Sequence, residues 1–344
     1  MIILPPSFPF GGMENPRLTF ATPTIIAGDR SLTALVAHEL AHSWSGNLVT
    51  NATWDDFWLN EGFTVYFERR IMESLYGKDY AEMLAQLGYQ DLLETVDGYM
   101  EDGQPKDTHL KLDLNDRNPD DGMSDIAYEK GYFFLRLVEN TVGREKFDVF
   151  LKDYFQGNAF KVMTTEAFII HLKANLLDST TYNSIGADNW IYGEGLPDNL
   201  PAPNSNKFEL VNAQIEAWKE GTAANKLTVV DWTSHEWLHF IRNLPMGLSF
   251  DKMKELDNAF KFTKSGNSEV LAAWFQHTIK NNYAPANQVM KDFLISVGRR
   301  KFLTPTYTAL KESGKMAMAK EIYKEARPNY HSVSKQTMDE LLGF

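Results

Sequence analysis

His38-Glu39-Leu40-Ala41-His42 lies in a helical pattern that begins near Ser31 and ends near Gly46. Two histidines four residues apart share one face of a helix, so both imidazoles can bind a single zinc ion about 2 Å from each nitrogen. Glu39 lies one residue further round the helix, beside the ion, where a general base takes a proton from metal-bound water. The pentapeptide therefore predicts a helix that carries two zinc ligands and a catalytic base.

A catalytic zinc ion usually has three protein ligands and one position open for water. The candidate for the third ligand is Glu61, in the segment Trp58-Leu59-Asn60-Glu61-Gly62 at the start of a second predicted helix, Phe63 to Met72. This helix can pack antiparallel to the first. Glu68 comes two turns further along, where we expect it to orient His42 from outside the ligand shell. The sequence thus predicts one zinc ion per chain, held by His38, His42 and Glu61.

A second pentapeptide of the same type, His235-Glu236-Trp237-Leu238-His239, has the same helical spacing. No Asn-Glu-Gly element follows it, and the next acidic residues, Asp251 and Glu255, come after a break that contains proline and glycine. Spacing alone does not distinguish the two motifs. The second motif lacks a candidate for the third ligand, so we expect only the first motif to bind the metal.

The composition of the 344 residues is that of a globular protein, with 43% apolar and 23% charged residues. The net charge of -12 argues against a general affinity for nucleic acid. No apolar run approaches the roughly 20 residues that span a bilayer, so no membrane partner is expected. There is no cysteine, so any metal must be held by His, Asp or Glu. The segment Met1 to Pro6 lacks the basic region of a secretory signal, which favours a cytoplasmic location.

The segment Gly193 to Asn206 is rich in glycine, proline, asparagine and aspartate, which cannot continue a helix or a central strand. We therefore expect a catalytic domain at 1–193, a linker at 194–206 and a helical domain at 207–344. In the last of these, Ser234, Ser249 and Ser268 each precede a helical pattern and are predicted N-caps. The pattern indicates consecutive antiparallel helices arranged as a solenoid.

Upstream stands Gly11-Gly12-Met13-Glu14-Asn15, and its combination with the zinc helix and Glu61 resembles peptidase family M1. Within that family the chain is most similar to the leukotriene A(4) hydrolase and aminopeptidase branch. The resemblance implies a mainly α fold: a thermolysin-like (gluzincin) zinc catalytic domain, truncated at its N-terminal side, followed by a superhelical, armadillo/HEAT-like domain. It also implies a zinc-dependent aminopeptidase that removes N-terminal residues from short peptides.

The same resemblance implies roles for several residues near the start of the chain. Glu14 would bind the free α-amine of the substrate through a charge-assisted hydrogen bond. Gly11, Gly12 and Met13 belong to the same substrate-binding motif, with the backbone amides of the two glycines at the edge of the cleft. Tyr128, in Ala127-Tyr128-Glu129-Lys130-Gly131, matches the family tyrosine whose hydroxyl stabilises the tetrahedral oxyanion.

Further residues match the leukotriene A(4) hydrolase branch alone. Arg299 and Lys301 match the basic pair that holds a substrate carboxylate. Asp120 matches an acid linked to epoxide hydrolysis, but Met123 stands where those hydrolases typically have another tyrosine. Peptide cleavage is therefore the expected reaction, and epoxide hydrolysis is the alternative.

Members of the family carry a large β-rich domain and further strands ahead of the point where this chain begins. This difference leaves open a truncated, inactive chain that serves as a zinc-binding or interaction module. A thermolysin-like endopeptidase is another alternative, since it would share the zinc helix and base but have no amine-binding acid. Neither the oligomeric state nor the preferred first residue of the substrate follows from the sequence.

Overall fold

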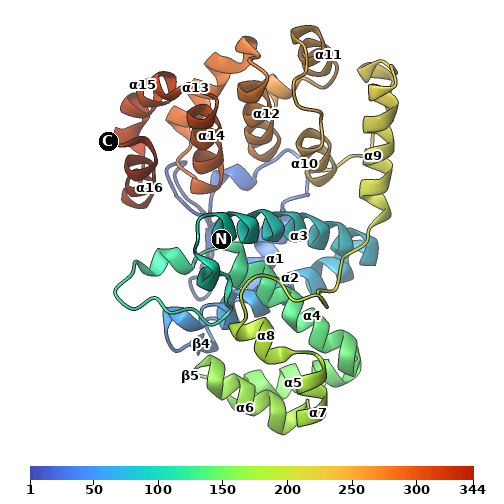
Figure 1. Cartoon of the computed structure of the whole chain (residues 1–344), viewed down its shortest axis with the longest axis vertical. Coiled ribbons are helices and arrows are strands. Elements are labelled where there is room, and N and C mark those ends of the chain that lie inside the picture. The colour runs from blue at the N-terminus through green and yellow to red at the C-terminus, as the bar shows by residue number, and fades with distance from the viewer. The chain divides into compact units, whose positions relative to one another are not determined.

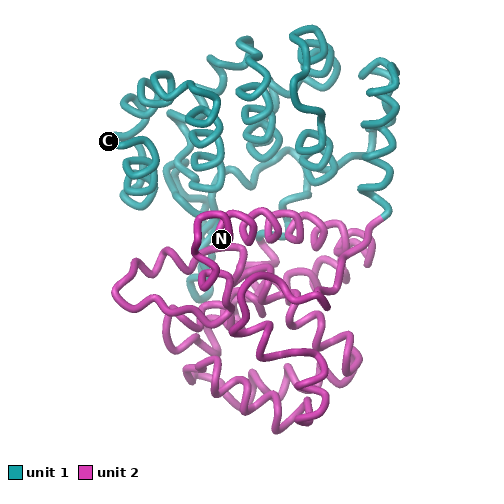
Figure 2. The backbone as a smooth tube through the Cα atoms, viewed as in Figure 1, with its two compact units in different colours: residues 1–35, 206–344 teal, residues 36–205 magenta.

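The computed structural model describes residues 1–344, which form two compact units. Unit 1 comprises residues 1–35 and 206–344, and unit 2 comprises residues 36–205 (Figure 2). Helix α1 (Thr33–Ala41) crosses from the first unit into the second. The structure is mainly helical, as predicted (Figure 1). The predicted division into domains at 1–193 and 207–344 with a linker between them stays a prediction.

Unit 2 is built around helix α2 (Trp58–Tyr76), which packs against α3, α4 and the π-helical turn η5. Its other helices are α3 (Lys78–Glu101), α4 (Gly131–Val142), α5 (Arg144–Gly157), α6 (Thr165–Asn175), α7 (Ser179–Ser184) and α8 (Ala187–Tyr192). The strands β4 (Val49–Asn51) and β5 (Lys161–Met163) pair in parallel. Short helical turns are η2 (Trp54–Asp56), η3 (Pro105–Thr108), η4 (Pro119–Gly122) and η5 (Ile126–Lys130).

The first part of α2 is buried on all sides, because every residue from Trp58 to Tyr66 is buried. Aromatic rings fill the space around it, and Phe63 packs on Tyr154 with ring centroids 5.5 Å apart. The carboxylate of Asp56, just before α2, is fully buried and accepts hydrogen bonds from the backbone and hydroxyl of Thr165, both at 2.8 Å. These contacts fix the start of α2, where Glu61 lies.

Unit 1 contains a three-stranded sheet and a set of short helices. The strands are β1 (Ile2–Ile3), β2 (Gly12–Met13) and β3 (Phe20–Ala21), with β3 in the middle, parallel to β1 and antiparallel to β2. The helices are α9 (Asn206–Lys219), α10 (Ser234–Arg242), α11 (Phe250–Phe260), α12 (Ser268–Lys280), α13 (Asn287–Ser296), α14 (Arg300–Glu312), α15 (Met316–Ala326) and α16 (Ser332–Leu342). Short turns are η1 (Pro23–Ile25), η6 (Ala224–Lys226), η7 (Phe262–Lys264), η8 (Ala284–Ala286) and η9 (Arg327–Asn329).

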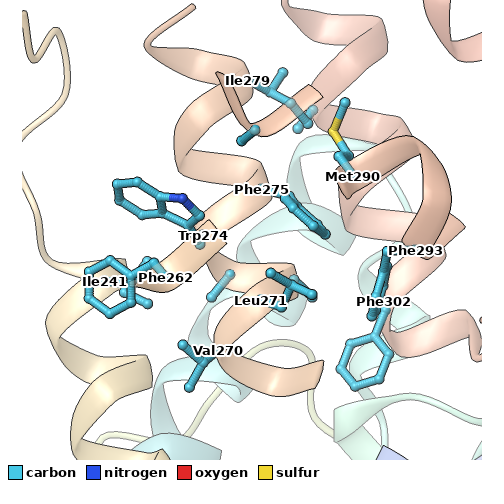
Figure 3. Packing of buried hydrophobic residues seen from close by; sticks show 14 of the residues in the cluster. Ile241, Phe262, Val270, Leu271, Trp274, Phe275, Ile279, Met290, Phe293 and Phe302 are labelled. Atoms are coloured by element: carbon cyan, nitrogen blue, oxygen red, sulfur yellow. The ribbon is translucent and has the colours of Figure 1, made fainter. Parts of the chain in front are cut away.

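The helices of unit 1 pack in a regular alternation. Helix α12 lies between α10 and α14, α14 also packs on α16, and α13 packs on α15. Helices two apart in the chain are therefore neighbours, which is the arrangement of a helical solenoid. Figure 3 shows Leu271 and Phe275 of α12 close to Phe293 of α13 and Phe302 of α14. The predicted superhelical, armadillo/HEAT-like fold of this part is confirmed.

Two helix starts in unit 1 differ by one residue from the prediction. Ser249 caps α11, as predicted. Helix α10, however, is capped by Thr233 and α12 by Asn267, so Ser234 and Ser268 are the first helical residues. Thr, Asn and Ser all accept hydrogen bonds from the first backbone amides, so adjacent capping residues compete. None of these helices, nor any other in the chain, combines the length and the apolar character needed to cross a membrane.

Candidate metal centre

His38, His42 and Glu61 come together inside unit 2, where α1 and α2 meet. The two Nε2 atoms are 3.2 Å apart, and the Oε2 atom of Glu61 lies 3.3 Å from Nε2 of His38 and 3.6 Å from Nε2 of His42. Ligands about 2 Å from a tetrahedral zinc ion are separated from one another by about 3.3 Å. The triangle formed by these three atoms therefore fits a zinc ion with a fourth position open.

The imidazole of His42 is held by three oxygen atoms on its Nδ1 side. Nδ1 lies 3.0 Å from the Ser45 carbonyl, 3.0 Å from Oδ1 of Asn60 and 3.1 Å from Oγ1 of Thr64. A carbonyl oxygen can only accept, so Nδ1 carries the proton and Nε2 presents a lone pair to the metal position. The sequence interpretation gave no role at the site to Ser45, Asn60 or Thr64. The available signal was the helical i, i+4 spacing of Asn60 and Thr64 beside Glu61.

Glu68 contacts His38 rather than His42, which corrects the prediction made from the sequence. Its Oε2 atom lies 3.0 Å from Nδ1 of His38. The reason is the order of contacts between α1 and α2: Asn60 and Thr64 of α2 meet His42, so Glu68, further along α2, meets the earlier residue of α1. Glu68 remains outside the ligand triangle and orients a ligand, although a different one from that predicted.

The charges of the cluster favour a cation. Burial by itself lowers the pKa of His38, but the carboxylates of Glu61 and Glu68 outweigh it and raise that pKa well above its ordinary value. Burial by itself raises the pKa of Glu61, but His42, His38 and a hydrogen bond from Tyr128 lower it below its ordinary value. The two carboxylates thus stabilise a positive charge at this position, and a divalent cation would supply such a charge.

Glu39 and Tyr128 lie beside the triangle. Glu39 is buried, at 7% exposure, and its carboxylate is within 4.8 Å of a ring nitrogen of His42. Tyr128 donates a hydrogen bond to Glu61, and its ring stacks on that of His38 with centroids 6.1 Å apart and an interplanar angle of 15°. A buried carboxylate and a hydroxyl thus lie next to the triangle of ligand atoms.

The other residues predicted near the start of the chain belong to unit 1. Gly12 and Met13 form β2, with Gly11 before the strand and Glu14 after it. Their substrate-binding roles stay a prediction. In unit 2, Asp120 lies in η4 and its predicted link to epoxide chemistry also remains untested.

Arg299 and Lys301, the predicted basic pair, share a partner that the sequence interpretation missed. Lys301 Nζ lies 2.9 Å from Glu269 Oε2, and Arg299 Nη1 lies 3.4 Å from Glu269 Oε1. Arg299 also donates to the Thr24 hydroxyl at 3.1 Å. Arg299 and Glu269 are buried, whereas the side chain of Lys301 is 52% exposed. The predicted contact of this pair with a substrate carboxylate stays a prediction.

The polar side chains of the second pentapeptide make structural hydrogen bonds within unit 1. His235 Nε2 lies 3.0 Å from the Ser31 carbonyl. His239 Nε2 lies 2.8 Å from Asn212 Oδ1, and its ring stacks on Phe208 at 3.9 Å. Glu236 forms the capping box of α10 with Thr233. The groups of His, Asp and Glu residues close enough to share a metal ion do not include these residues.

Comparison with known proteins gives two family matches that together span most of the chain. The model of the family described as "Peptidase family M1 domain" matches residues 1–190. The model described as "Leukotriene A4 hydrolase, C-terminal" matches residues 232–342.

Curated relatives and solved structures agree with these matches. Leucine aminopeptidase 2 of Emericella nidulans is 38% identical, and that of Yarrowia lipolytica is 37% identical, each over 97% of this chain. The chain spans 55% and 54% of the length of these two relatives. The structure of yeast LTA4 hydrolase in complex with bestatin matches with a TM-score of 0.85 at 32% identity, over 98% of this chain and 58% of that one. The native hydrolase from Saccharomyces cerevisiae gives a TM-score of 0.81.

Proposed function

The chain belongs to peptidase family M1, and from that premise we propose that it is a zinc-dependent aminopeptidase that releases the first residue of short peptides. The observation that carries the proposal is the triangle of ligand atoms from His38, His42 and Glu61, with sides of 3.2, 3.3 and 3.6 Å. Two relatives named leucine aminopeptidase 2 support the same reaction class.

One zinc ion per chain would be held by His38, His42 and Glu61. A bound zinc ion supplies a Lewis acid and lowers the pKa of its water to about 7. Glu39 would act as the general base, taking a proton from the attacking water and passing it to the leaving amine. Its position supports this role, because the buried carboxylate lies next to His42, one of the three proposed ligands.

Tyr128 donates a hydrogen bond to the oxyanion that develops on the attacked carbonyl. Its hydrogen bond to Glu61 supports this role, since it places a hydroxyl donor next to the metal ligands. Glu14 binds the α-ammonium group of the substrate, which restricts cleavage to the first peptide bond. Arg299 and Lys301 bind the carboxylate at the other end of a short peptide.

The test compares Glu39→Gln with Glu236→Gln, the same change in the second pentapeptide. Each purified protein is measured for zinc content and for hydrolysis of leucyl-p-nitroanilide. We expect about one zinc per chain in both variants and in the wild type. Hydrolysis should fall by at least about 100-fold in Glu39→Gln, as for the loss of a general base, and stay near wild type in Glu236→Gln.

Two outcomes, one of this experiment and one of a parallel assay with an N-acetylated peptide, would favour other functions. Zinc bound at one per chain with no hydrolysis by the wild type would favour a zinc-binding module. Undiminished cleavage of an N-acetylated peptide would favour an endopeptidase and remove Glu14 from its proposed role.

A further inference from the structure

Tyr128 is carried by the π-helical turn η5, which runs directly into α4 at Gly131. Such turns are rare and are frequently found at functional sites, because the extra residue redirects a side chain. The side chain of Tyr128 reaches Glu61, while the next two residues, Glu129 and Lys130, are buried on other sides of the turn. The position of the hydroxyl therefore depends on what holds its two neighbours.

Lys130 is fully buried, and backbone carbonyl oxygens surround its ammonium group. Nζ donates to the carbonyls of Thr108 at 2.6 Å, Gly195 at 2.8 Å and Gly193 at 3.2 Å. An ammonium group has three donors, so all three are used. Burial lowers the pKa of Lys130 to about 7, and the three carbonyl acceptors favour its protonated form. The ammonium group thereby joins η5 to two segments far away in the chain.

Other contacts of η5 hold it from different directions. The carboxylate of Glu129 accepts from Arg69 at 2.8 Å, at a place where Gly88 of α3 leaves room for it. At the end of the turn, the backbone of Gly131 lies directly against that of Gly62. If either glycine carried a Cβ atom, that atom would lie only 2.9 Å from the Cα atom of the other glycine. Gly62 directly follows Glu61, so this contact sets the distance between the turn and the metal ligand.

We propose that Lys130 is a positioning residue for Tyr128: its three hydrogen bonds hold the π-helical turn so that the Tyr128 hydroxyl stays beside Glu61. This inference rests on the proposed function, because only a hydrolase needs the hydroxyl at a fixed place. The proposal explains why an ammonium group is kept in the interior, where burial of a charge is costly without compensating contacts. The contacts of Glu129 and Gly131 still hold the turn when the ammonium group of Lys130 is removed, so we expect a local shift of the turn rather than its unfolding.

The test is a double-mutant cycle between Lys130→Met and Tyr128→Phe, with hydrolysis of leucyl-p-nitroanilide as the readout. Methionine keeps the unbranched stem and removes the ammonium group. We expect Tyr128→Phe to lower kcat about 100-fold, as for an oxyanion donor, and Lys130→Met to lower it about tenfold with KM within about twofold. The double variant should match Tyr128→Phe, since Lys130 acts through that hydroxyl. A loss of about 1000-fold in the double variant would overturn the proposal.

A stability control separates positioning from general destabilisation. Leu172→Ala removes a buried side chain of α6 in the same unit and lowers stability while keeping every hydrogen bond of Glu129 and Lys130 described above. We expect its kcat per folded molecule to stay at the wild-type value. If the activity lost by Lys130→Met is likewise explained entirely by the fraction of unfolded protein, so that kcat per folded molecule stays at the wild-type value, Lys130 has no positioning role.

A second measurement does not depend on activity. The chain is labelled with 3-fluorotyrosine, and the ¹⁹F NMR signal of Tyr128 is identified as the one missing in Tyr128→Phe. We expect Lys130→Met to shift or broaden this signal and Leu172→Ala to leave it unchanged. An unchanged Tyr128 signal in Lys130→Met would refute the inference about Lys130, whether or not the wild type hydrolyses the substrate. A wild type without any hydrolysis would by itself refute only the proposed function.

Discussion

Replacing Gly62 with alanine tests whether α2 and α4 must touch backbone to backbone for the metal centre to form. A Cβ atom on Gly62 would lie 2.9 Å from the Cα atom and 3.0 Å from the carbonyl carbon of Gly131. Ordinary contacts begin at 3.4 Å, so the two backbones must separate by at least about 0.5 Å. Neither partner is a flexible side chain, and the helices must therefore move as bodies.

The size of the effect follows from two opposing contributions. Overpacking of a close contact costs about 1–3 kcal/mol, and alanine in a helix is favoured over glycine by about 1 kcal/mol. We expect Gly62→Ala to lower the free energy of unfolding by about 1–2 kcal/mol. Gly98→Ala is the matched control, since Gly98 lies in α3 of the same unit and a Cβ atom there meets nothing within 4 Å. That control should gain about 0.5–1 kcal/mol.

Urea unfolding of both variants, followed by circular dichroism, measures these changes. Hydrolysis of leucyl-p-nitroanilide by Gly62→Ala should also fall by about tenfold or more, because Glu61 moves together with Gly62 and small misplacements of reacting groups are costly. If Gly62→Ala were as stable as Gly98→Ala and kept wild-type activity, the close approach of the two backbones would not set the site.

Three further predictions concern the ligand shell, the metal and the pH. Glu68→Gln should weaken zinc binding about 10- to 100-fold, measured by competition with a chromogenic chelator, because it loses the carboxylate that orients His38; unchanged affinity would contradict the assignment. Removal of zinc by 1,10-phenanthroline should abolish hydrolysis and lower the unfolding temperature, both restored by added zinc, because a ligand that binds only the folded state stabilises it. Burial lowers the pKa of His239 and of His277 to about 4, against about 6.5 in the unfolded chain, so on acidification the unfolded chain takes up these protons first. The contribution of these two histidines to stability should therefore be complete above pH 6.5 and be lost between pH 6.5 and 4, by up to about 1.4 kcal/mol per histidine and pH unit in urea unfolding. A His277→Gln variant should show a smaller loss over this range.

Local spacing explains why part of the site could be predicted from the sequence. Two histidines at positions i and i+4 must face the same way on one helix, and Glu61 lies in the first turn of the next α-helix. Which of the two histidines Glu68 contacts depends instead on how the two helices are aligned where they cross. That order is a tertiary property, which is why the sequence interpretation paired Glu68 with His42 and the structure pairs it with His38.

Burial of charged residues was the other feature that the sequence did not reveal. Lysine and glutamate are mostly exposed in proteins, yet the side chains of Lys130 and Glu269 are buried and hold neighbouring segments in place. A lysine surrounded by carbonyl oxygens leaves no local signal, because its partners come from positions 108, 193 and 195. The helical solenoid, in contrast, followed from successive amphipathic segments and short connections.

The location of the metal ion is the measurement that tests the central claim most directly. Crystals of the purified chain, grown with zinc, can be measured on both sides of the zinc absorption edge. We predict one anomalous peak per chain, about 2 Å from Nε2 of His38, from Nε2 of His42 and from a carboxylate oxygen of Glu61. A zinc peak at His235 and His239, or no peak among the three predicted ligands, would contradict the account.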